Sequence, residues 1–299
     1  MTHPTISILM AAHDAQAYLP ATLDSLLAQN YGDWELQVAD DRSTDGTPDI
    51  LRRYSQRDGR IRPQFLERNL GPAGARNAVL ARATGTWVAI LDADDLWRPG
   101  KLKTQVAALQ NHPGAVWGYH GMRMVRGDQV VREPIGHEPR FGTLKQLITH
   151  CGVVHSSVMV SRAALGEVGG YNASLWGTED WDLWIRLMQR YGEQAVVCLP
   201  QVLGDYRVHT SNISALAERS TANDRKLLRQ ILLRRGFFLA HPLLTLHAVD
   251  GQIERELDRL RKGQRHGRAT VYALGSALAQ PWKRWRWRRL ADVCRGRMP

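Results

Sequence analysis

Two groups of aspartates each follow an apolar, strand-like run, at Asp40-Asp41 and at Asp92-Ala93-Asp94-Asp95. Adjacent carboxylates at the end of a buried strand repel one another unless a cation neutralises them. Either group alone also fits a solvated turn, which Asp favours. Together they indicate a site for a divalent metal and a nucleotide, because ligands bind beyond the carboxyl ends of strands in open α/β sheets.

A third acidic group, Glu179-Asp180-Trp181-Asp182, opens a helical pattern whose apolar positions suit the core. A carboxylate at this point could remove a proton from a hydroxyl. From spacing alone Glu179, Asp180 and Asp182 are equally good candidates, and all three also suit the positive end of a helix dipole. The pattern therefore predicts either a general base or only the start of a helix.

Strands and helices alternate in the first part of the chain and must position the aspartates. The pattern predicts strands at residues 6–11, 35–39, 61–66 and 87–91, and helices at 18–29, 47–57 and 73–83. Such alternation implies a parallel sheet with helices around it. A further helix is expected from Pro99, because proline suits a first turn, with Leu102, Val106 and Leu109 facing inward.

The pattern changes after about residue 113. Residues 115–132 are typical of a hairpin, residues 144–149 of a short helix and residues 158–160 of a strand. We expect one domain with two halves. Its halves lie at about 1–112 and at about 113–214.

Residues 215–299 are expected to form a helical, basic extension, with helices at 221–235 and 252–262. The formal net charge of the chain is +11, and residues 252–299 contribute +9 of it, since 13 Lys and Arg there stand against 4 Asp and Glu. The segment 282–289 mixes Trp with Lys and Arg, which suits an anionic membrane surface, a nucleic-acid arm or a solvated helix. We expect membrane contact rather than nucleic acid, and deletion of 282–289 should abolish liposome binding.

Residues 5–215 resemble glycosyltransferase family 2, the inverting glycosyltransferases with the GT-A fold, of the bacterial cell-surface polysaccharide type. The matching motifs occur in the family's order: ISILMAAHDAQAYLPATLDSLLAQ, ADDRSTDGT, NLGPAGARNAVLARATGTWVAILDADD, GGYNASLWGTEDWDLWIRL and YRVHTSNIS. The resemblance implies an α/β fold, with a Rossmann-like sheet for a nucleoside diphosphate sugar and flanking helices. It also implies that the half at about 1–112 binds the nucleotide sugar and the half at about 113–214 the acceptor.

The resemblance places the donor site in the first three motifs. Asp41 would accept a hydrogen bond from the nucleobase, and a carboxylate facing the imide N–H of uracil favours UDP, although thymidine has the same edge. Arg42 stands where the family usually has Gly, and His13-Asp14 where it commonly has Tyr-Asn, so His13 either packs on the base or fills the loop. The implied donor-binding residues are His13, Asp40, Asp41, Arg76, Asn77 and Asp92.

Asp92-Ala93-Asp94 resembles the family's DxD motif. This implies Mn²⁺ or Mg²⁺ held mainly by Asp94 with His209 nearby, and such a cation would neutralise charge on a departing diphosphate. In the 179–182 group the resemblance identifies Asp180 as the catalytic base. Further residues implied around the metal or the acceptor are Asp95, His155, Glu179, Trp181 and Arg207.

Cysteine spacing and the start of the chain bear on location. Cys151, Cys198 and Cys294 have no CxxC spacing, and the chain opens with MTHPT rather than a basic leader, so we expect a reducing, cytoplasmic setting without a secretion signal. No later apolar run reaches the roughly 20 residues of a membrane-spanning helix. The basic segment allows peripheral attachment to the cytoplasmic face of the inner membrane.

The predicted activity is metal-dependent, inverting transfer of a sugar from a nucleoside diphosphate donor, expected to be a UDP-sugar, to a hydroxyl of a glycan or lipid-linked acceptor. Two other functions stay open. A nucleotidyltransferase would not need the acidic group at 179–182, and a nucleotide-sugar-binding or scaffold protein would lack turnover. The joint presence of Asp94, Asp180 and His209 argues against a pure binder, which has no use for a base.

Overall fold

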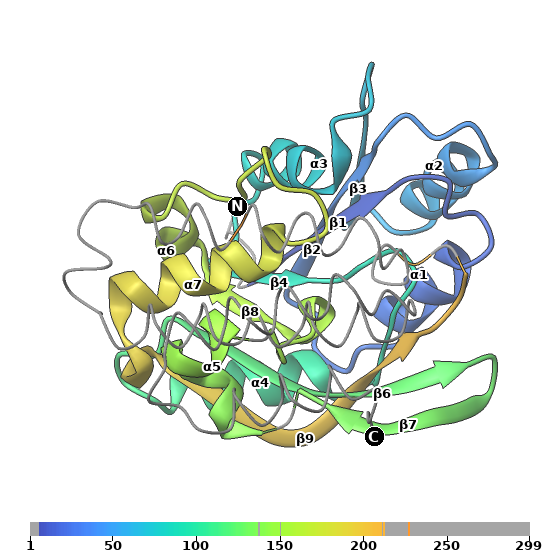
Figure 1. The fold of residues 1–299 in the computed structure, drawn as a ribbon. Coiled ribbons are helices and arrows are strands. Elements are labelled where there is room, and N and C mark those ends of the chain that lie inside the picture. Colours follow the sequence, from blue (N-terminus) through green and yellow to red (C-terminus); the bar gives the residue numbers. More distant parts are fainter. Residues whose placement is uncertain (1–5, 137, 150, 211, 213–226, 228–299) are drawn as a thin grey trace, which may run out of the picture. The chain divides into compact units, whose positions relative to one another are not determined.

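The computed structural model describes residues 6–136, 138–149, 151–210, 212 and 227. Within them the chain forms a mixed sheet of nine strands with flanking helices (Figure 1). None of the helices in these residues is long and apolar enough to cross a bilayer. The predicted extension at 215–299, with its helices and the segment 282–289, lies outside the described residues apart from Leu227.

The first four strands form a parallel sheet in the order β3-β2-β1-β4, as the alternating pattern predicts. The elements are β1 (Ile6–Ala12), α1 (Leu19–Leu27), β2 (Trp34–Asp40), α2 (Thr47–Arg57), β3 (Ile61–Phe65), α3 (Gly71–Leu80) and β4 (Trp87–Ile90). Because these strands run in one direction, Asp40 and the loop after β4 lie at the same edge of the sheet.

Beyond β4 the sheet is mixed, so the expectation of a parallel sheet holds only for its first half. β8 runs antiparallel to β4 and β6, β9 runs parallel to β6, β5 pairs antiparallel with β9, and β7 forms the predicted hairpin with β6. The elements are β5 (Leu96–Trp97), α4 (Lys101–Gln110), β6 (Trp117–Arg126), β7 (Gln129–Ile135), α5 (Leu144–Thr149), β8 (Met159–Ser161), α6 (Arg162–Glu167), α7 (Glu179–Tyr191) and β9 (Val196–Arg207), with single 3₁₀ turns at Pro139–Gly142, His155–Ser157 and Glu193–Ala195. The sequence-based prediction lacks β9, because Pro, Gly and Asp interrupt its apolar run.

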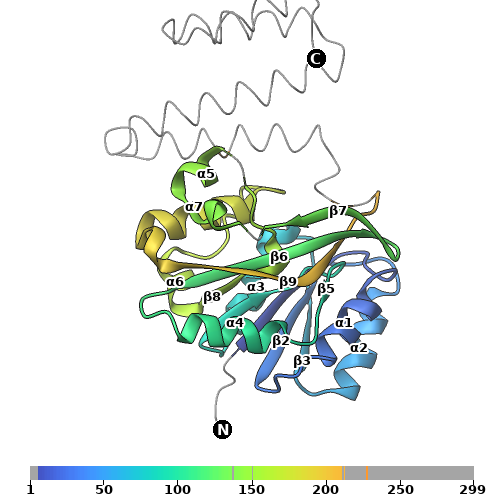
Figure 2. The ribbon, with the colours of Figure 1, turned by 90° about the horizontal axis from the view of Figure 1, so that it is seen from below.

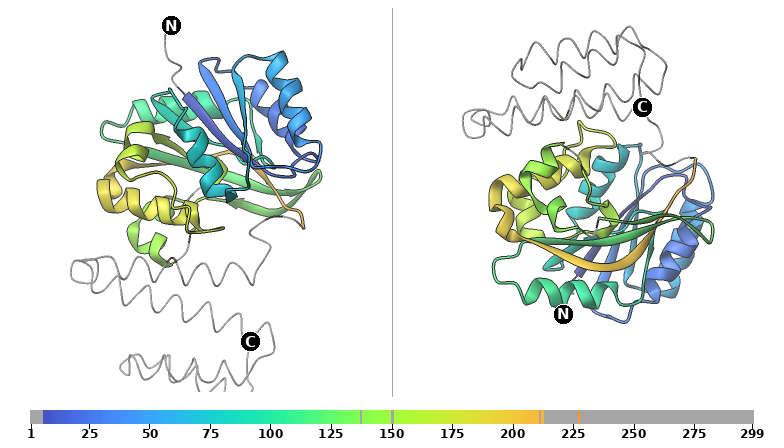
Figure 3. Two further views of the ribbon diagram at one scale, coloured as in Figure 1. Left: turned by 90° about the horizontal axis from the view of Figure 1, so that it is seen from above. Right: turned by 60° about the horizontal axis from the view of Figure 1, so that its bottom comes forward.

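Helices cover both faces of the sheet (Figures 2 and 3). α1, α2 and α4 share one apolar core with β1 and β2, and Leu102, Val106 and Leu109 of α4 are buried in it, as predicted. α3 packs on β1 and β2 from the other face, because a right-handed connection from β3 to β4 leads there. α7 lies on the same face as α3, which brings the start of α7 toward the loop after β4 (Figure 1).

Two turns at the carboxyl edge have left-handed backbone at residues other than glycine. Asp14 has a φ of 47° and Arg42 a φ of 59°. The Oδ1 atom of Asp14 accepts a hydrogen bond from the Thr44 N–H at 2.7 Å, and the Asp14 N–H donates to Ser43 Oγ at 3.0 Å. The loops after β1 and β2 are thereby tied together. Arg42 adopts the turn that glycine favours, at a cost of about 1–2 kcal/mol.

Candidate active site

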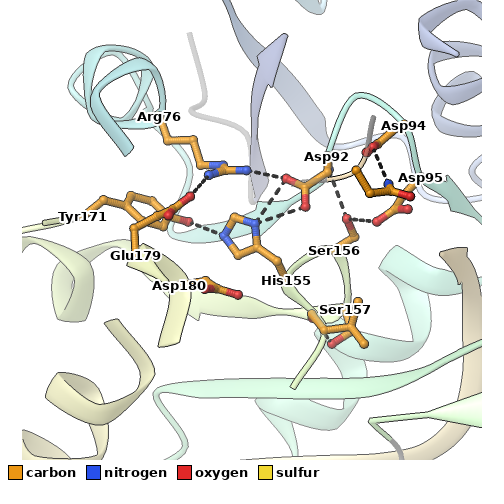
Figure 4. Close-up of polar contacts among 12 residues, drawn as sticks. Arg76, Asp92, Asp94, Asp95, His155, Ser156, Ser157, Tyr171, Glu179 and Asp180 are labelled. Atoms are coloured by element: carbon orange, nitrogen blue, oxygen red, sulfur yellow. Dashed lines mark hydrogen bonds and ion pairs between the residues drawn. The ribbon is translucent and has the colours of Figure 1, made fainter. Parts of the chain in front are cut away.

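Arg76 of α3 joins two of the acidic groups at the centre of the site (Figure 4). Its Nη2 donates to Asp92 Oδ1 at 2.6 Å, and its Nη1 donates to Glu179 Oε1 at 3.0 Å. Burial disfavours the charge of Arg76, but the two carboxylates raise its pKa overall. The guanidinium therefore connects the loop after β4 to the start of α7.

His155 holds the other side of Asp92. Its Nδ1 lies 3.1 Å from Asp92 Oδ1, and its Nε2 lies 3.0 Å from the Tyr171 hydroxyl. Burial disfavours the charge of Asp92, but His155 and Arg76 hold the pKa of this carboxyl well below its usual range. An ionised carboxylate only accepts hydrogen bonds, so His155 Nδ1 carries a proton. Asp92 is thus an anion whose charge the protein itself balances.

Asp94 has a different set of partners. Its Oδ2 lies 3.0 Å from His209 Nε2 and accepts a hydrogen bond from Asn212 Nδ2 at 3.2 Å. Tyr18 stacks on the His209 ring, with centroids 4.2 Å apart. Burial and the neighbouring Asp92 raise the pKa of Asp94, and His209 opposes them. Within the described residues no Lys or Arg forms an ion pair with Asp94.

Asp94 and His209 offer a carboxylate oxygen and an imidazole nitrogen, which suit Mn²⁺ and, through the oxygen, Mg²⁺. In the part of the chain that the structure describes, no group of three or more His, Cys, Asp or Glu side chains could hold a metal ion. Mg²⁺ commonly binds one or two carboxylates and takes its other ligands from water and substrate phosphates. The two side chains therefore fit a cation shared with a diphosphate rather than a closed protein site.

Asp95 and Arg207, which the resemblance places around the metal or the acceptor, have hydrogen-bond partners within the fold. Asp95 is fully buried, and its Oδ2 accepts from Ser156 Oγ at 2.5 Å and its Oδ1 from the Arg207 N–H at 3.1 Å. The Arg207 guanidinium donates to the carbonyl oxygen of Asp94 and to Thr22 Oγ1 at 2.6 Å. Both residues hold the loop that carries Asp94.

Two of the three acids of α7 have arginine partners. Glu179 is buried against Arg76, and Asp182, also buried, accepts a hydrogen bond from Arg186 Nε at 2.7 Å. These ion pairs remove Glu179 and Asp182 as candidates for a free base, although their spacing had left them equal to Asp180.

Asp180 is the remaining acid of α7, and it is partly exposed. Its Oδ1 accepts a hydrogen bond from the Trp181 N–H at 2.7 Å, and within the described residues no cation lies at ion-pair distance from it. Burial raises the pKa of Asp180 to about 6, with His155 opposing the rise and Glu179 adding to it. In Figure 4 its carboxylate lies beside His155 and Glu179.

The candidate nucleoside site lies at the ends of β1 and β2. Asp41 Oδ1 accepts from the Leu70 N–H at 2.7 Å, and the Asp41 carbonyl oxygen lies 2.9 Å from His13 Nδ1. The side chain of His13 is 47% exposed, so its ring has a free face. Asp40 is buried, and its Oδ1 has no hydrogen-bond partner among the described residues. A donor could satisfy this oxygen.

Asn77, expected at the donor, and Trp181, expected near the acceptor, both make hydrogen bonds within the fold. Both amide atoms of Asn77 bond to the Tyr171 backbone, Nδ2 to the carbonyl oxygen at 2.8 Å and Oδ1 to the N–H at 2.9 Å. The indole N–H of the buried Trp181 donates to the Leu147 carbonyl oxygen. Asn77 thus fixes Tyr171, which contacts His155.

Comparison with known proteins gives this arrangement a family. The family model described as Glycosyl transferase family 2 matches residues 7–168. The chain belongs to glycosyltransferase family 2. TuaG of Bacillus subtilis (strain 168), a teichuronic acid biosynthesis glycosyltransferase by name, is 31% identical over 216 residues, which are 71% of this chain and 82% of TuaG. The Escherichia coli protein named UDP-Glc:alpha-D-GlcNAc-diphosphoundecaprenol beta-1,3-glucosyltransferase WfgD is 29% identical over 243 residues, 81% of this chain and 89% of WfgD.

Solved structures share the fold of this family 2 glycosyltransferase. Staphylococcus aureus TarS 1–349 in complex with UDP superposes with a TM-score of 0.60 at 21% identity, covering 86% of this chain and 72% of that one. The mannosyltransferase PcManGT from Pyrobaculum calidifontis, in complex with GDP-Man and Mn²⁺, has a TM-score of 0.60 at 20% identity and covers 99% of this chain and 88% of its own. The predicted GT-A type of α/β fold is confirmed.

Two residues that support the glycosyltransferase site, Tyr171 and Asn212, have no assigned role in the sequence-based prediction. Tyr171 and Asn212 lie inside the family motifs, in GGYN and HTSN. Their polar side chains within these motifs could have identified them as site residues. Ser156 lies beside His155, and only the fold places its hydroxyl between Asp95 and the Asp92 N–H.

Proposed function

We propose that this family 2 glycosyltransferase moves a sugar from a UDP-sugar to a hydroxyl of a glycan or lipid-linked acceptor, with a divalent metal and with inversion. One observation carries the proposal. Arg76 forms ion pairs with both Asp92 and Glu179, whereas within the described residues the side-chain partners of Asp94 are the His209 imidazole and the Asn212 amide, and Asp180 forms no ion pair. Asp94 could therefore bind a metal cation, and Asp180 could take a proton from the acceptor hydroxyl.

The nucleoside would bind at the ends of β1 and β2. The unpartnered Oδ1 of Asp40 would accept a hydrogen bond from the imide N–H of uracil or from a ribose hydroxyl, since a buried acceptor without a partner is costly. Asp41 lies next to it and His13 offers an exposed ring face. These residues suit a uridine nucleotide, whose imide N–H can donate to a carboxylate.

Asp94 and His209 would hold Mn²⁺ or Mg²⁺. When bound, such a cation stabilises the negative charge that gathers on the departing diphosphate. The protein keeps the two ligands in place through Asn212, which bonds to Asp94 Oδ2, and through Arg207, which bonds to the Asp94 carbonyl oxygen. Asp92 stays with Arg76 and His155 and fixes the loop.

Asp180 would act as the general base. A carboxylate with a pKa of about 6 is ionised at neutral pH and is more basic than an exposed one. It would take the proton from the acceptor hydroxyl as that oxygen attacks the anomeric carbon from the face opposite the diphosphate. A single displacement of this kind inverts the configuration.

The relatives suggest the setting. TuaG is named for teichuronic acid biosynthesis, and WfgD for a UDP-Glc donor and a diphosphoundecaprenol-linked acceptor. We infer from these names a role in cell-surface polysaccharide synthesis on a lipid-linked acceptor. A membrane contact through 282–289 would bring the enzyme to such an acceptor and stays a prediction.

The partly exposed Asp180 argues against both alternatives. A nucleotidyltransferase attacks at phosphorus and needs no base at an acceptor sugar. A protein that only binds a nucleotide sugar gains nothing from an unpaired carboxylate, because burial without a counter-charge costs stability.

Calorimetric titration with UDP, dTDP, GDP and ADP, each with and without Mn²⁺, tests the donor half of this proposal. We expect UDP to bind best, and at least about tenfold more tightly with the metal because the metal carries much of the diphosphate charge. Asp94→Asn should lose the metal effect, and Asp128→Asn, at an exposed turn between β6 and β7, should keep it. Metal-independent binding, or no binding of any diphosphate, would overturn the proposal.

A further inference from the structure

Three fully buried polar side chains of α4 and β6 lie outside the site described above. They are Lys101, Gln105 and His120, and the exposed fraction of each is 0%. Lys101 Nζ, Gln105 Oε1 and His120 Nε2 have no hydrogen-bond partner among the described residues. Buried polar atoms are nearly always satisfied by protein or ordered water, so three such atoms close together require an explanation.

The three side chains form one cluster. Lys101 and Gln105 are one helical turn apart on α4 and therefore share a face. Gln105 Nε2 donates to the Gly118 carbonyl oxygen at 3.0 Å, which places it beside β6, where His120 follows two residues later. Lys101 lies near enough to His120 to lower its pKa electrostatically.

The cluster contacts the turn at His155–Ser157, which underlies the aspartate loop. Gln105 Nε2 donates to the Ser157 carbonyl oxygen at 2.9 Å. Lys101 Nζ lies 3.6 Å from the centroid of the Trp97 ring, and the Trp97 indole N–H donates to the Ser156 carbonyl oxygen at 2.8 Å. Gln105 thus bonds directly to the Ser157 carbonyl group, and Lys101 contacts Trp97, which bonds to the Ser156 carbonyl group of the same turn.

That turn in turn fixes the aspartates. Ser156 Oγ donates to Asp95 Oδ2 at 2.5 Å and accepts from the Asp92 N–H at 3.1 Å. A displacement of the Ser156 backbone would therefore move the loop that carries Asp94. Lys101 is connected to this loop through Trp97, which it contacts, and through Ser156, to which Trp97 and the loop both bond.

We propose that Lys101, Gln105 and His120 form an internal polar cluster, bridged by a buried water, that positions the Ser156–Ser157 turn beneath the aspartate loop. Lys101 is a positioning residue of this cluster. The inference rests on the proposed function in so far as the loop binds a metal and a diphosphate. A buried water needs two to four polar partners, and the three unpartnered atoms can supply up to three.

The protonation states fit hydrogen bonding rather than charge. Burial lowers the pKa of Lys101 well below its usual value, and burial together with Lys101 lowers the pKa of His120 to about 3. An amine donates hydrogen bonds in either protonation state, and a neutral imidazole whose Nδ1 faces the Gly121 carbonyl oxygen, 2.9 Å away, keeps Nε2 as an acceptor. A side chain used only for packing would be better served by Met, because a buried amine must be desolvated.

Three variants test the cluster. Lys101→Met removes the polar atom and keeps the length, Lys101→Gln keeps a hydrogen-bond donor without an amine, and Lys103→Met alters an exposed lysine of the same helix. Hydrogen exchange would be measured on peptides that cover residues 153–158 and, as an internal reference, β1. UDP affinity with Mn²⁺ and the denaturation midpoint would be measured on the same samples.

We expect Lys101→Met to be at least as stable as the wild type at pH 7, yet to exchange about tenfold faster at 153–158 and to bind UDP with Mn²⁺ about tenfold more weakly, as outer-shell changes commonly do. Lys101→Gln should restore most of both losses, and Lys103→Met should change neither. A merely structural role would lower the denaturation midpoint together with affinity.

Unchanged exchange at 153–158 in Lys101→Met would overturn the inference, as would equal effects of Met and Gln. If the wild-type enzyme itself fails to bind any diphosphate, the proposed function is wrong. The exchange result would then still decide whether the cluster holds the turn, so the two failures are distinguishable.

Discussion

The carboxylates on the two sides of the loop after β4 have different kinds of partner. On one side Arg76 binds both Asp92 and Glu179, and His155 adds a second contact to Asp92. On the other side Asp94 has the imidazole of His209 and the amide of an asparagine. Asp92 and Glu179 share an arginine partner, whereas no arginine or lysine pairs with Asp94 among the described residues. We infer a division of work between Asp92, which fixes the loop, and Asp94, which would meet a bound ligand.

Asp180 differs from Asp92 and Glu179, which both pair with Arg76. It lies next to Glu179, yet within the described residues it has no arginine, and burial raises its pKa to about 6. A group whose charge is left unbalanced among balanced neighbours is a candidate for chemistry, because perturbed carboxyls gather at functional sites.

Asp180→Asn tests this exception and should have the largest effect on rate. The amide keeps the shape but cannot accept a proton, so turnover should fall by about 10²–10⁴-fold, the usual contribution of a general base. UDP binding with Mn²⁺ should stay unchanged, because Asp180 does not face the metal ligands. Asp182→Asn is the matched control, since it removes an ion pair with Arg186 and should lower stability without changing the turnover of the folded enzyme.

The pH dependence gives an independent check of the same residue. The base must be ionised, so the rate should fall about tenfold per pH unit below pH 6. The folded-state pKa is raised from 3.8 to about 6, so the fold loses stability as the pH rises through this window. Asp180→Asn should lack this loss and should be about 1–3 kcal/mol more stable than the wild type at pH 7, since one pKa unit corresponds to about 1.4 kcal/mol. A variant that is fully active, or a rate that is flat down to pH 5, would reject Asp180 as the base.

Arg76→Met tests the balanced side itself. The change leaves Asp92 and Glu179 buried without their shared cation, so the free energy of unfolding should fall by about 3–5 kcal/mol in chemical denaturation at pH 7. Part of this loss should be recovered near pH 5, where the two carboxyls protonate more easily in the variant. Arg82→Met changes an exposed arginine just after the same helix and should have little effect. A loss below about 1 kcal/mol is typical of exposed ion pairs, and would mean that Arg76 does not stabilise the fold through its buried pairs with Asp92 and Glu179.

Much of the first half of the fold follows from local patterns. The helix at Thr47–Arg57 agrees with its predicted ends, because Pro48 suits the first turn and Ile50, Leu51 and Tyr54 form one buried face. The hairpin of β6 and β7 likewise follows from its turn. β9 escapes prediction because a long bent strand can hold Pro, Gly and Asp at positions that no single period describes.

The candidate site, like the fold, is predicted only in part by the sequence. Residue types and motifs place the acids at the right edge of the sheet, but they do not choose partners. Arg76 and Glu179 are 103 residues apart and meet only because α3 and α7 lie on one face of the sheet. The guanidinium of Arg207 donates to Thr22 and to the Asp94 carbonyl oxygen, and these contacts depend on how β9 passes the loop.

Asn212 allows a test of how Asp94 and His209 are held as proposed metal ligands. Its Nδ2 donates to Asp94 Oδ2 at 3.2 Å, and its Oδ1 accepts from the His209 N–H at 2.6 Å, so one amide orients both proposed metal ligands. Asn212→Ala should weaken UDP binding in the presence of Mn²⁺ by about 10–100-fold, the usual effect of removing a partner of a metal ligand. Binding without the metal should not change, and Asn30→Ala, at an exposed position, should behave as the wild type. If Asn212→Ala weakened binding equally with and without Mn²⁺, the amide would support the nucleotide rather than the metal ligands, and the division of work between Asp92 and Asp94 would need another basis.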